Sequence, residues 1–220
     1  MSAIGWDLPQ WAERVAESLG DARYVNLGVG LPAKLPHYLA SRSIMFHCEN
    51  GIVGTGPAPD AGHEIPELID ASSNSVSLQP GGVVVPFEVS FSIIRGGHLD
   101  ATVLGAYQVS AGGDLANWSI PGARIAGVGG AMDLAVGARR VIVMMHHTNR
   151  DGSPKIVDEL TYPMTARGCV DVIVTNCAVI DVTPAGLTVR DVPEGVTIEE
   201  LQGMTGAPLR LSVAETRPGR

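Results

Sequence analysis

Strand-like and helix-like segments alternate along this chain, and this alternation constrains the fold more than any other feature. Apolar runs typical of buried strands occupy residues 24–28, 44–48, 101–106, 140–145, 170–180 and 186–189. Helix-like segments occupy residues 9–19, 65–71, 86–94 and 196–204, with a short one after Pro32. Such alternation favours one α/β layer structure. We therefore expect a single domain over residues 1–220, with its core at residues 10–205 and a mostly parallel sheet flanked by helices.

Local signals mark where several of these segments end. In residues 9–19, Trp11, Val15 and Leu19 lie on one helical stripe, and Gly20 follows as a stop signal. Gly96-Gly97 closes residues 86–94, and Thr197 is the expected cap of the last helix. A Thr-Pro-Ala-Gly turn at residues 183–186 joins the last two strands.

Composition narrows the class of protein. The chain is 45% hydrophobic but only 5% aromatic, which favours closely packed β-branched strands over an aromatic binding platform. No apolar run approaches the roughly 20 residues of a membrane helix, and the first residues do not show the basic-then-apolar pattern expected of a secretory signal. The net charge of −8, without a cluster of Lys and Arg, disfavours nucleic acid. The three cysteines form no C-x-x-C pair, which argues against zinc and fits a reducing, cytoplasmic compartment.

Glu49 is the strongest single candidate for chemistry. It follows an apolar strand and opens a glycine-punctuated turn that contains Asn50, Gly51, Gly54 and Gly56. Ligands bind at strand ends in α/β proteins, and glycine lets the backbone approach them closely. A carboxylate there serves as a nucleophile, a base or a metal ligand. The alternative is that Glu49 caps a following helix and that Asn50-Gly51 is an ordinary turn.

Two glycine-rich segments have a similar character. The first, residues 26–30, follows a strand and includes Asn26, Gly28 and Gly30, but it lacks the later glycine of a dinucleotide-binding fingerprint. In the second, residues 127–135, a glycine run that includes Gly129 and Gly130 opens a small-residue helix. Helix starts present unpaired N–H groups that suit an oxyanion or a phosphate. Close helix–sheet packing explains the same glycines equally well.

A polar stretch at residues 105–118, which includes Gln108 and Asn117, either lines a cleft or forms a surface hairpin. The pair His146-His147 suggests a metal site with Asp151. Neighbouring residues on a strand point to opposite faces, however, so we expect these histidines to be structural or to line a cleft.

Two further side chains invite functional interpretations. Cys48 has no partner histidine placed by the sequence, so a small buried thiol is the simpler interpretation. Arg95 fits a cation at the C-terminal end of a helix better than a phosphate clamp.

Six ordered motifs together resemble one known family. They are residues 26–32, Glu-Asn-Gly at residues 49–51 with the following glycines, Ile-Arg-Gly-Gly-His-Leu-Asp at 94–100, Gly-Asp-Leu-Ala-Asn-Trp at 113–118, Ile-Pro-Gly at 120–122, and Gly-Gly-Ala-Met-Asp-Leu at 129–134. In this order they resemble the B (beta) subunit of the family I CoA-transferases, specifically the succinyl-CoA:3-oxoacid and 3-oxoadipate branch. The resemblance extends over residues 10–205.

The resemblance implies specific roles for matching residues. Glu49 corresponds to the nucleophile of a Ser-Glu-Asn-Gly motif, in which Cys48 here replaces the serine. Gly129 and Gly130 correspond to a backbone region that helps stabilise the oxyanion. We expect substrate or CoA contacts at residues of the glycine-rich and polar segments: Asn26, Gly28, Gly30, Asn50, Gly51, Gln108 and Asn117.

The implied reaction needs no metal, flavin or nicotinamide, because CoA is both a substrate and a transient covalent partner. A succinyl-CoA-like donor would pass CoA to acetoacetate or 3-oxoadipate through a glutamyl-CoA thioester. In such enzymes an A subunit of similar fold packs against the B subunit, so an A₂B₂ assembly is expected. The sequence departs from the family pattern at residues 79–86, Ser119 and Met145, which leaves the acid substrate open.

Two alternatives belong to other classes. One is a hydrolase of CoA esters on the same scaffold, with water as the acceptor and Glu49 as a base. The other is a non-enzymatic ligand sensor, although the chain has neither a helix-turn-helix segment nor a basic patch.

Overall fold

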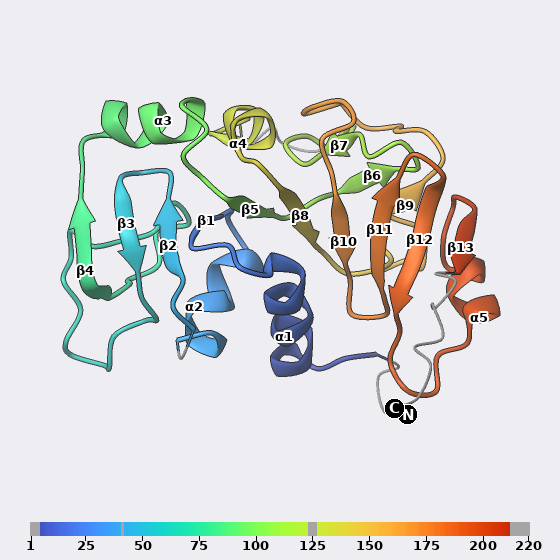
Figure 1. Cartoon of the computed structure of the whole chain (residues 1–220), viewed down its shortest axis with the longest axis horizontal. Coiled ribbons are helices and arrows are strands. Elements are labelled where there is room, and N and C mark those ends of the chain that lie inside the picture. The colour runs from blue at the N-terminus through green and yellow to red at the C-terminus, as the bar shows by residue number, and fades with distance from the viewer. Residues whose placement is uncertain (1–4, 41, 123–126, 212–220) are drawn as a thin grey trace, which may run out of the picture.

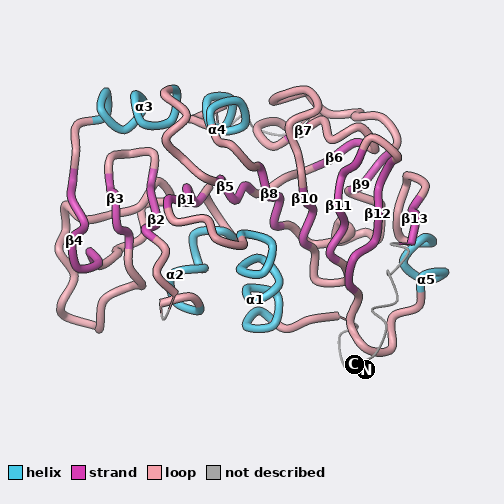
Figure 2. The backbone as a smooth tube through the Cα atoms, viewed as in Figure 1, coloured by secondary structure: helices cyan, strands magenta, loops and turns pink. Residues whose placement is uncertain are grey.

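The computed structural model describes residues 5–40, 42–122 and 127–211. Within these residues, ten strands form one sheet in the order β13-β12-β11-β10-β8-β5-β1-β2-β3-β4, and three form a small second sheet in the order β7-β6-β9. Figure 2 shows the large sheet as one continuous band of strands with helices on either side. Five of its nine pairings are parallel. The mostly parallel α/β fold is confirmed, while the predicted ends at residues 1–4 and 212–220 lie outside the described residues.

The parallel centre of the large sheet consists of the predicted apolar strands. They are β1 (Tyr24–Leu27), β2 (Met45–Cys48), β5 (Ala101–Leu104), β8 (Val141–Met144) and β10 (Val172–Val174). Antiparallel pairings extend this centre on both sides, through β3 (Ile52–Thr55) and β4 (Leu78–Val84) on one side and β11 (Val179–Thr183) and β12 (Gly186–Asp191) on the other. The far edge is β13 (Leu209–Leu211), which pairs with β12 in parallel.

The helices begin and end largely where the sequence predicts. They are α1 (Leu8–Leu19), the 3₁₀ turn η1 (Pro32–Lys34), α2 (Leu35–Tyr38), α3 (Phe87–Arg95), α4 (Ala131–Gly137) and α5 (Ile198–Gly203). Gly20 ends α1 with a φ of 58°, a conformation that glycine adopts without strain. Thr197 caps α5 in a reciprocal capping box with Glu200, as predicted.

Alternate residues of the sheet face two separate cores. In β8, Ile142 and Met144 pack with the apolar side of α1 and with α2, whereas Val141 and Val143 pack with α3 and α4. This alternation follows from the two-residue period of a strand. Figure 1 shows the two helix pairs on opposite sides of the sheet. Because both faces are covered, the central strands are mostly apolar, and their buried polar residues Asn26, His47 and Thr102 are exceptions.

The polar stretch at residues 105–118 folds as a hairpin, but not as the surface hairpin that was one of its two predicted forms; its two ends, residues 105–107 and 117–118, line a cleft, which was the other form. Its strands are β6 (Gln108–Ser110) and β7 (Leu115–Ala116), and β9 (Ile156–Val157) pairs with β6 in parallel. The hairpin is buried, because its residues Val109 and Leu115, together with Ile156 of the neighbouring β9, belong to the core on the side of the sheet that α3 and α4 cover.

Residues 65–71 were predicted to be helical, and this prediction is wrong. The segment is a loop with a turn at Pro66 and a single bridge between Ile69 and Ser75. The Asp70 carboxylate accepts hydrogen bonds from the backbone N–H groups of Ser72 and Asn74, at 2.8 and 2.9 Å. Such side chain–backbone bonds offer the chain an alternative to helix formation.

The apolar run at residues 170–180 was predicted as one strand, but it forms β10 and β11, two antiparallel strands joined by a tight turn. The Thr175 hydroxyl accepts hydrogen bonds from the backbone N–H groups of Cys177 and Ala178, at 3.0 and 2.9 Å. These bonds turn the chain back inside an apolar run that carries no glycine or proline.

In the ranges described above, no helix has the length and apolar character needed to cross a bilayer.

Candidate active site

A cleft of about 570 Å³ opens at the carboxyl ends of the central strands. The loops that follow β1, β2, β5 and β8 line it, together with the turn that begins α4. The carboxyl ends of parallel strands are the usual position of ligand sites in open α/β sheets. The cleft therefore lies where the sequence analysis placed the candidate chemistry.

Glu49 meets the glycine turn of α4 inside this cleft. The backbone N–H of Gly130 donates to Glu49 Oε1 at 3.1 Å, across 81 residues of sequence. An added Cβ at Gly130 would lie 2.5 Å from Glu49 Oε2, and one at Gly129 would lie 3.3 Å from Oε1. Glycine is therefore required at position 130 for the carboxylate to lie against the backbone. The structure brings together the three residues predicted to be catalytic.

The position of Glu49 depends on a hairpin and not on a helix. Cys48 pairs with Ile52, so Glu49, Asn50 and Gly51 form a three-residue connection between β2 and β3. The proposed alternative, in which Glu49 caps a following helix, is wrong because a strand follows. Gly51 has a φ of 116°, and an added Cβ there would lie 2.3 Å from the Val85 carbonyl oxygen. Gly51 therefore serves the close approach of the β4 end, and the described lining of the cleft does not include it.

A buried chain of hydrogen bonds fixes the backbone of Glu49. Thr102 Oγ1 donates to Asn26 Oδ1 at 3.0 Å, and Asn26 Nδ2 lies 3.0 Å from His47 Nδ1. His47 Nε2 lies 3.0 Å from Ser90 Oγ, and the Ser90 hydroxyl donates to the Glu49 carbonyl at 2.7 Å. An amide N–H₂ can only donate, so this geometry requires a neutral His47 with its proton on Nε2. Burial lowers the pKa of His47 to about 4, which keeps the ring neutral.

The environment of Glu49 makes its carboxylate more basic. Burial raises the pKa of Glu49, and the negative charge of Asp133 raises it further, while the Gly130 hydrogen bond lowers it. Asp133 is itself paired with Arg95, whose Nε lies 2.7 Å from Asp133 Oδ1. Arg95 is therefore a helix-end cation, as predicted, and it reduces the repulsion between the two carboxylates. A partly desolvated carboxylate is a stronger nucleophile than one in water.

The remaining predicted contact residues divide into two groups. Gly28, Gly30 and Asn117 line the cleft. Asn26, Asn50, Gly51 and Gln108 are not among the described residues that line it. The Gln108 side chain holds the Thr161–Tyr162 backbone, accepting from both N–H groups at 2.9 and 3.1 Å. Asn50 Nδ2 donates to the Ile69 carbonyl at 2.7 Å. The structure therefore places these four residues outside the lining of this cleft, and their direct contacts with substrate or CoA stay predictions.

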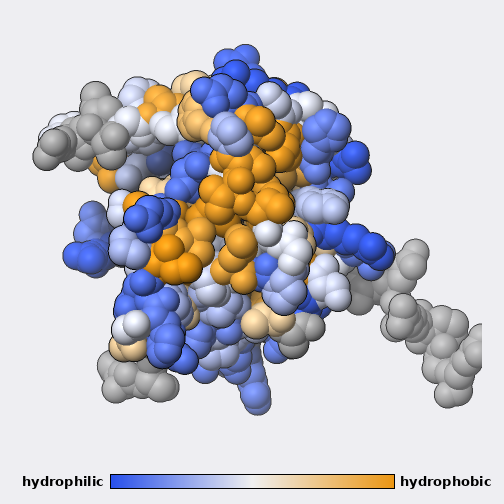
Figure 3. Space-filling model, turned by 90° about the vertical axis from the view of Figure 1, so that its left-hand side faces the viewer, coloured by the Kyte–Doolittle hydropathy of each residue, from blue (hydrophilic) through white to orange (hydrophobic). Residues whose placement is uncertain are grey.

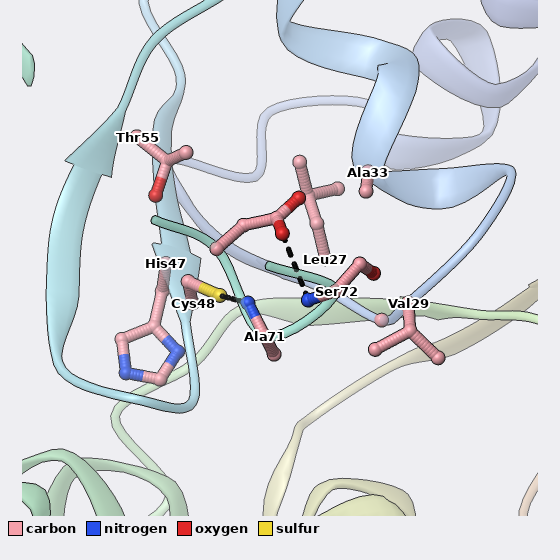
Figure 4. A pocket seen from close by; sticks show the side chains of 10 residues that line it. Leu27, Val29, Ala33, His47, Cys48, Thr55, Ala71 and Ser72 are labelled. Carbon is pink, nitrogen blue, oxygen red and sulfur yellow. Dashed lines mark hydrogen bonds between the residues drawn. The ribbon is translucent and has the colours of Figure 1, made fainter. Parts of the chain in front are cut away.

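Cys48 lines a small cavity of about 10 Å³ that shares Gly28, Val29 and Ala71 with the wall of the cleft. Figure 4 shows its thiol directed at the backbone of Ala71, whose N–H donates to Cys48 Sγ at 3.2 Å. Burial raises the pKa of the Cys48 thiol, so little thiolate forms at neutral pH. Cys48 is therefore a buried packing residue, as predicted.

The adjacent histidines point to opposite sides of the chain. His146 is exposed and lines the cleft, with its ring 5.3 Å from that of Trp11. His147 is buried between the hydroxyls of Thr175 and Thr205, at 3.0 and 2.9 Å. Burial lowers the pKa of His147 to about 4. In the part of the chain that the structure describes, no three His, Cys, Asp or Glu side chains are grouped as metal ligands would be.

Lys155 is a cleft residue that the sequence analysis missed. It lies immediately before β9 and lines the same cleft as Glu49. Burial lowers the pKa of its ammonium group to about 8. The available signal was its rarity, because Lys34 and Lys155 are the only lysines in the sequence.

Comparison with known proteins gives a consistent result. A family model described as coenzyme A transferase matches residues 9–203. The chain is 52% identical over 203 residues to the B subunit of 3-oxoadipate CoA-transferase from Acinetobacter baylyi, a match that covers 91% of this chain and 93% of that protein. It is 43% identical over 202 residues to human mitochondrial succinyl-CoA:3-ketoacid coenzyme A transferase 2, covering 90% of this chain and 39% of the human one.

A solved structure supports the fold. The crystal structure of an acyl-CoA transferase from Escherichia coli O157:H7 superimposes with a TM-score of 0.74 at 17% identity. The match covers 94% of this chain and 42% of that one. At this identity the likeness concerns the fold alone. The human and E. coli chains are both much longer than the region that they share with this chain.

Proposed function

The chain belongs to the coenzyme A transferase family, and we propose that it is the B subunit of an enzyme that moves CoA from a succinyl-CoA-like donor to a 3-oxo acid, either acetoacetate or 3-oxoadipate. The observation that carries this proposal is the Glu49 carboxylate held by the Gly130 N–H on the wall of a large cleft. Membership of an enzyme family also argues against the ligand-sensor alternative.

The proposed mechanism uses Glu49 as the nucleophile. Its carboxylate attacks the donor thioester carbonyl, and the C–S bond breaks to give an acyl-glutamyl anhydride and CoA thiolate. The thiolate attacks Cδ of Glu49 and releases the donor acid, which leaves a glutamyl-CoA thioester. The acceptor carboxylate then attacks the same Cδ and releases CoA thiolate again. This thiolate attacks the acceptor acyl carbon, which yields the new acyl-CoA and regenerates Glu49.

The hydrogen bond from Gly130 suggests where the backbone assists. The family resemblance predicts that it acts on the oxyanion of the bound thioester, yet it donates to Glu49 itself. When the thiolate or the acceptor attacks Cδ, negative charge develops on that Glu49 oxygen. A donor already in place requires no reorganisation, and one such donor is typically worth about 3 kcal/mol. We therefore assign Gly130 to the two steps at the glutamyl carbon.

We also propose that the reaction needs no resident cofactor. Each step exchanges one acyl bond for another, so no electron is transferred and the only leaving groups are a thiolate and carboxylates. CoA acts as a substrate and as a transient covalent partner of Glu49.

An exposed apolar surface supports an A-subunit partner. β4 is the edge strand next to the β2–β3 hairpin that carries Glu49. Figure 3 shows apolar side chains gathered on this side of the molecule. The exposed residues of β4 and the start of α3 include Leu78, Val83, Val84, Phe87 and Val89. An uncovered apolar edge strand otherwise promotes aggregation. We call these five residues the β4 patch and propose that the A subunit covers it.

The assembly and its location follow as further parts of this proposal. The Acinetobacter relative is named as a B subunit, and the human relative carries the matching region within a longer chain. We propose an A₂B₂ assembly in the cytoplasm, with residues 1–220 of this chain forming one domain. Support for one domain comes from the large sheet, which spans from β1 to β13.

The decisive experiment captures the intermediate. The chain, combined with its A subunit, is incubated with succinyl-CoA in the absence of an acceptor, and the Glu49 peptide is examined by mass spectrometry. We expect a CoA adduct on Glu49 in the wild type, and neither an adduct nor turnover in Glu49→Ala. Substantial turnover by Glu49→Ala would exclude this mechanism. Steady release of CoA without any acceptor would instead identify a hydrolase.

A further inference from the structure

The cleft contains two residues of opposite full charge. Among the described residues that line it, Glu49 and Lys155 are the ones that carry a full charge at neutral pH. His146 and Tyr107 are the other titratable groups on its walls. The nucleophile and a single ammonium group thus share one binding space in a chain of net charge −8.

The backbone of Lys155 lies between His147, three residues past the end of β8, and Val109 of β6. Its N–H donates to the His147 carbonyl at 3.4 Å, and its own carbonyl accepts from the Val109 N–H at 3.0 Å. The side chain forms no ion pair with any residue in the described ranges. A half-buried ammonium without a carboxylate partner is costly, and the lowered pKa of Lys155 reflects that cost. A bound anion would remove it.

The sheet sets the separation between the two residues. β2 ends at Cys48, the residue before Glu49, and β8 ends at Met144, three residues before the His147 carbonyl that Lys155 contacts; β1 and β5 lie between these two strands. Three strand spacings place the ends of β2 and β8 about 14 Å apart. At roughly 1.2 Å per bond, the Glu and Lys side chains extend about 4 and 6 Å from their Cα atoms. The gap between carboxylate and ammonium is therefore about 4 Å when the two side chains point toward each other and about 14 Å when both stand perpendicular to the line between them.

A dicarboxylic acyl group fits this gap. The end carbons of a four-carbon or six-carbon diacid lie about 4 or 6 Å apart by the same bond length. Adding contact distances of about 3 Å at each end gives a span of roughly 10 to 12 Å. A monocarboxylic acyl group of the same length reaches Lys155 only with a methyl group, which offers the ammonium nothing.

We propose that Lys155 binds the distal carboxylate of a dicarboxylic acyl group whose thioester carbonyl lies at Glu49, and so selects succinyl-type and 3-oxoadipyl-type substrates. This inference rests on the proposed transferase function and adds a substrate class to it. Lys155 determines specificity and takes no part in bond exchange. A charge-assisted hydrogen bond between ammonium and carboxylate supplies the discrimination.

The test compares two donors of equal length in the complex with the A subunit. Succinyl-CoA carries the distal carboxylate, and butyryl-CoA ends in a methyl group. We expect Lys155→Met to lower kcat/KM for succinyl-CoA by about 10- to 100-fold, mainly through KM, and to change that for butyryl-CoA much less. Lys34→Met, at the only other lysine, serves as the matched control and should preserve the preference for succinyl-CoA.

The outcomes separate this proposal from the transferase itself. If Lys155→Met lost kcat/KM equally with both donors, or kept the preference for succinyl-CoA, while Glu49 was still labelled by CoA, the proposed role of Lys155 would be overturned and the transferase function would stand. Absence of labelling with either donor would instead overturn the transferase function.

A second measurement does not depend on the folding of a variant. Lysine-directed acetylation of the wild-type complex should be slowed at Lys155 by succinyl-CoA, whose acyl group ends in a carboxylate, and not by butyryl-CoA, whose acyl group ends in a methyl group, with Lys34 as the internal reference. Equal protection by both donors, or by neither, would also overturn the proposal.

Discussion

Replacing Gly130 with alanine is the sharpest test of the site, because the added carbon meets the nucleophile and little else. Its Cβ would lie 2.5 Å from Glu49 Oε2 and 2.9 Å from Cδ, with Phe91 Cζ next at 3.2 Å. Ordinary van der Waals contact begins at 3.4 Å, so the carboxylate must retreat by about 0.9 Å. Displacements near 1 Å commonly cost about 10²-fold in rate, and loss of an oxyanion donor costs about 10²- to 10³-fold. We therefore expect kcat to fall by at least about 10²-fold.

The same substitution should barely change stability. Gly130 has φ −84° and ψ 4°, which alanine adopts without strain. The atoms that must move belong to the end of a flexible side chain. We expect the free energy of unfolding to change by less than about 1 kcal/mol. The assay is transfer from succinyl-CoA by the complex with the A subunit, normalised to folded protein by circular dichroism and urea denaturation.

Gly137→Ala, at the other end of α4, is the matched control. Its Cβ would lie 2.3 Å from the Ile94 carbonyl oxygen, where backbone must yield. This variant should lose about 1 to 3 kcal/mol of stability while its folded fraction keeps its turnover. If Gly130→Ala retained most of its kcat, or lost activity only in proportion to folded protein, the assigned role of the Gly130 N–H would be wrong.

Two further predictions concern acid stability and the partner surface. His47 and His147 have a pKa of about 4 in the fold against 6.5 in the unfolded chain, so the unfolded chain binds more protons between these values. The free energy of unfolding should therefore fall as pH drops from about 6.5 to 4, by up to roughly 3 kcal/mol per histidine. Urea denaturation at pH 7 and at pH 5 measures this fall. The His147→Gln variant should reduce the dependence of the unfolding free energy on pH, whereas the variant of an exposed histidine, His63→Gln, should not. The second prediction concerns the β4 patch: Val84→Asp should prevent co-purification with the A subunit. Leu211→Asp on the opposite edge strand is the matched control and should not prevent it, because the two side chains are similarly exposed, at 64% for Val84 and 60% for Leu211. Full assembly of the Val84 variant would place the partner elsewhere.

The sequence determined the elements whose signals are local. A stripe of apolar residues and a glycine stop define α1, and Thr197 with Glu200 defines the start of α5. Runs rich in apolar residues define the central strands, because strands covered on both faces are mostly apolar. The sequence also placed Glu49 at a strand end, since the apolar run stops immediately before it.

Local signals failed where hydrogen bonds to side chains decided the backbone. Residues 65–71 have helical spacing, yet Asp70 binds the neighbouring backbone and leaves a loop. Residues 170–180 are apolar throughout most of their length, yet the Thr175 hydroxyl turns the chain in the middle. The sequence indicates neither bond in advance, because Asp and Thr side chains can bind the backbone or point to solvent.

Only the tertiary structure distinguished cleft residues from supporting ones. Asn26 and Gln108 are polar residues in or beside glycine-containing loops, as substrate-binding residues often are, but their hydrogen bonds are made inside the protein. Conversely, Gly130 reaches Glu49 across 81 residues, and Lys155 joins the same cleft from the start of β9. The physical reason is range. Helix and strand periodicity is set by neighbours in the sequence, whereas a site is assembled from strand ends that the sheet order alone brings side by side.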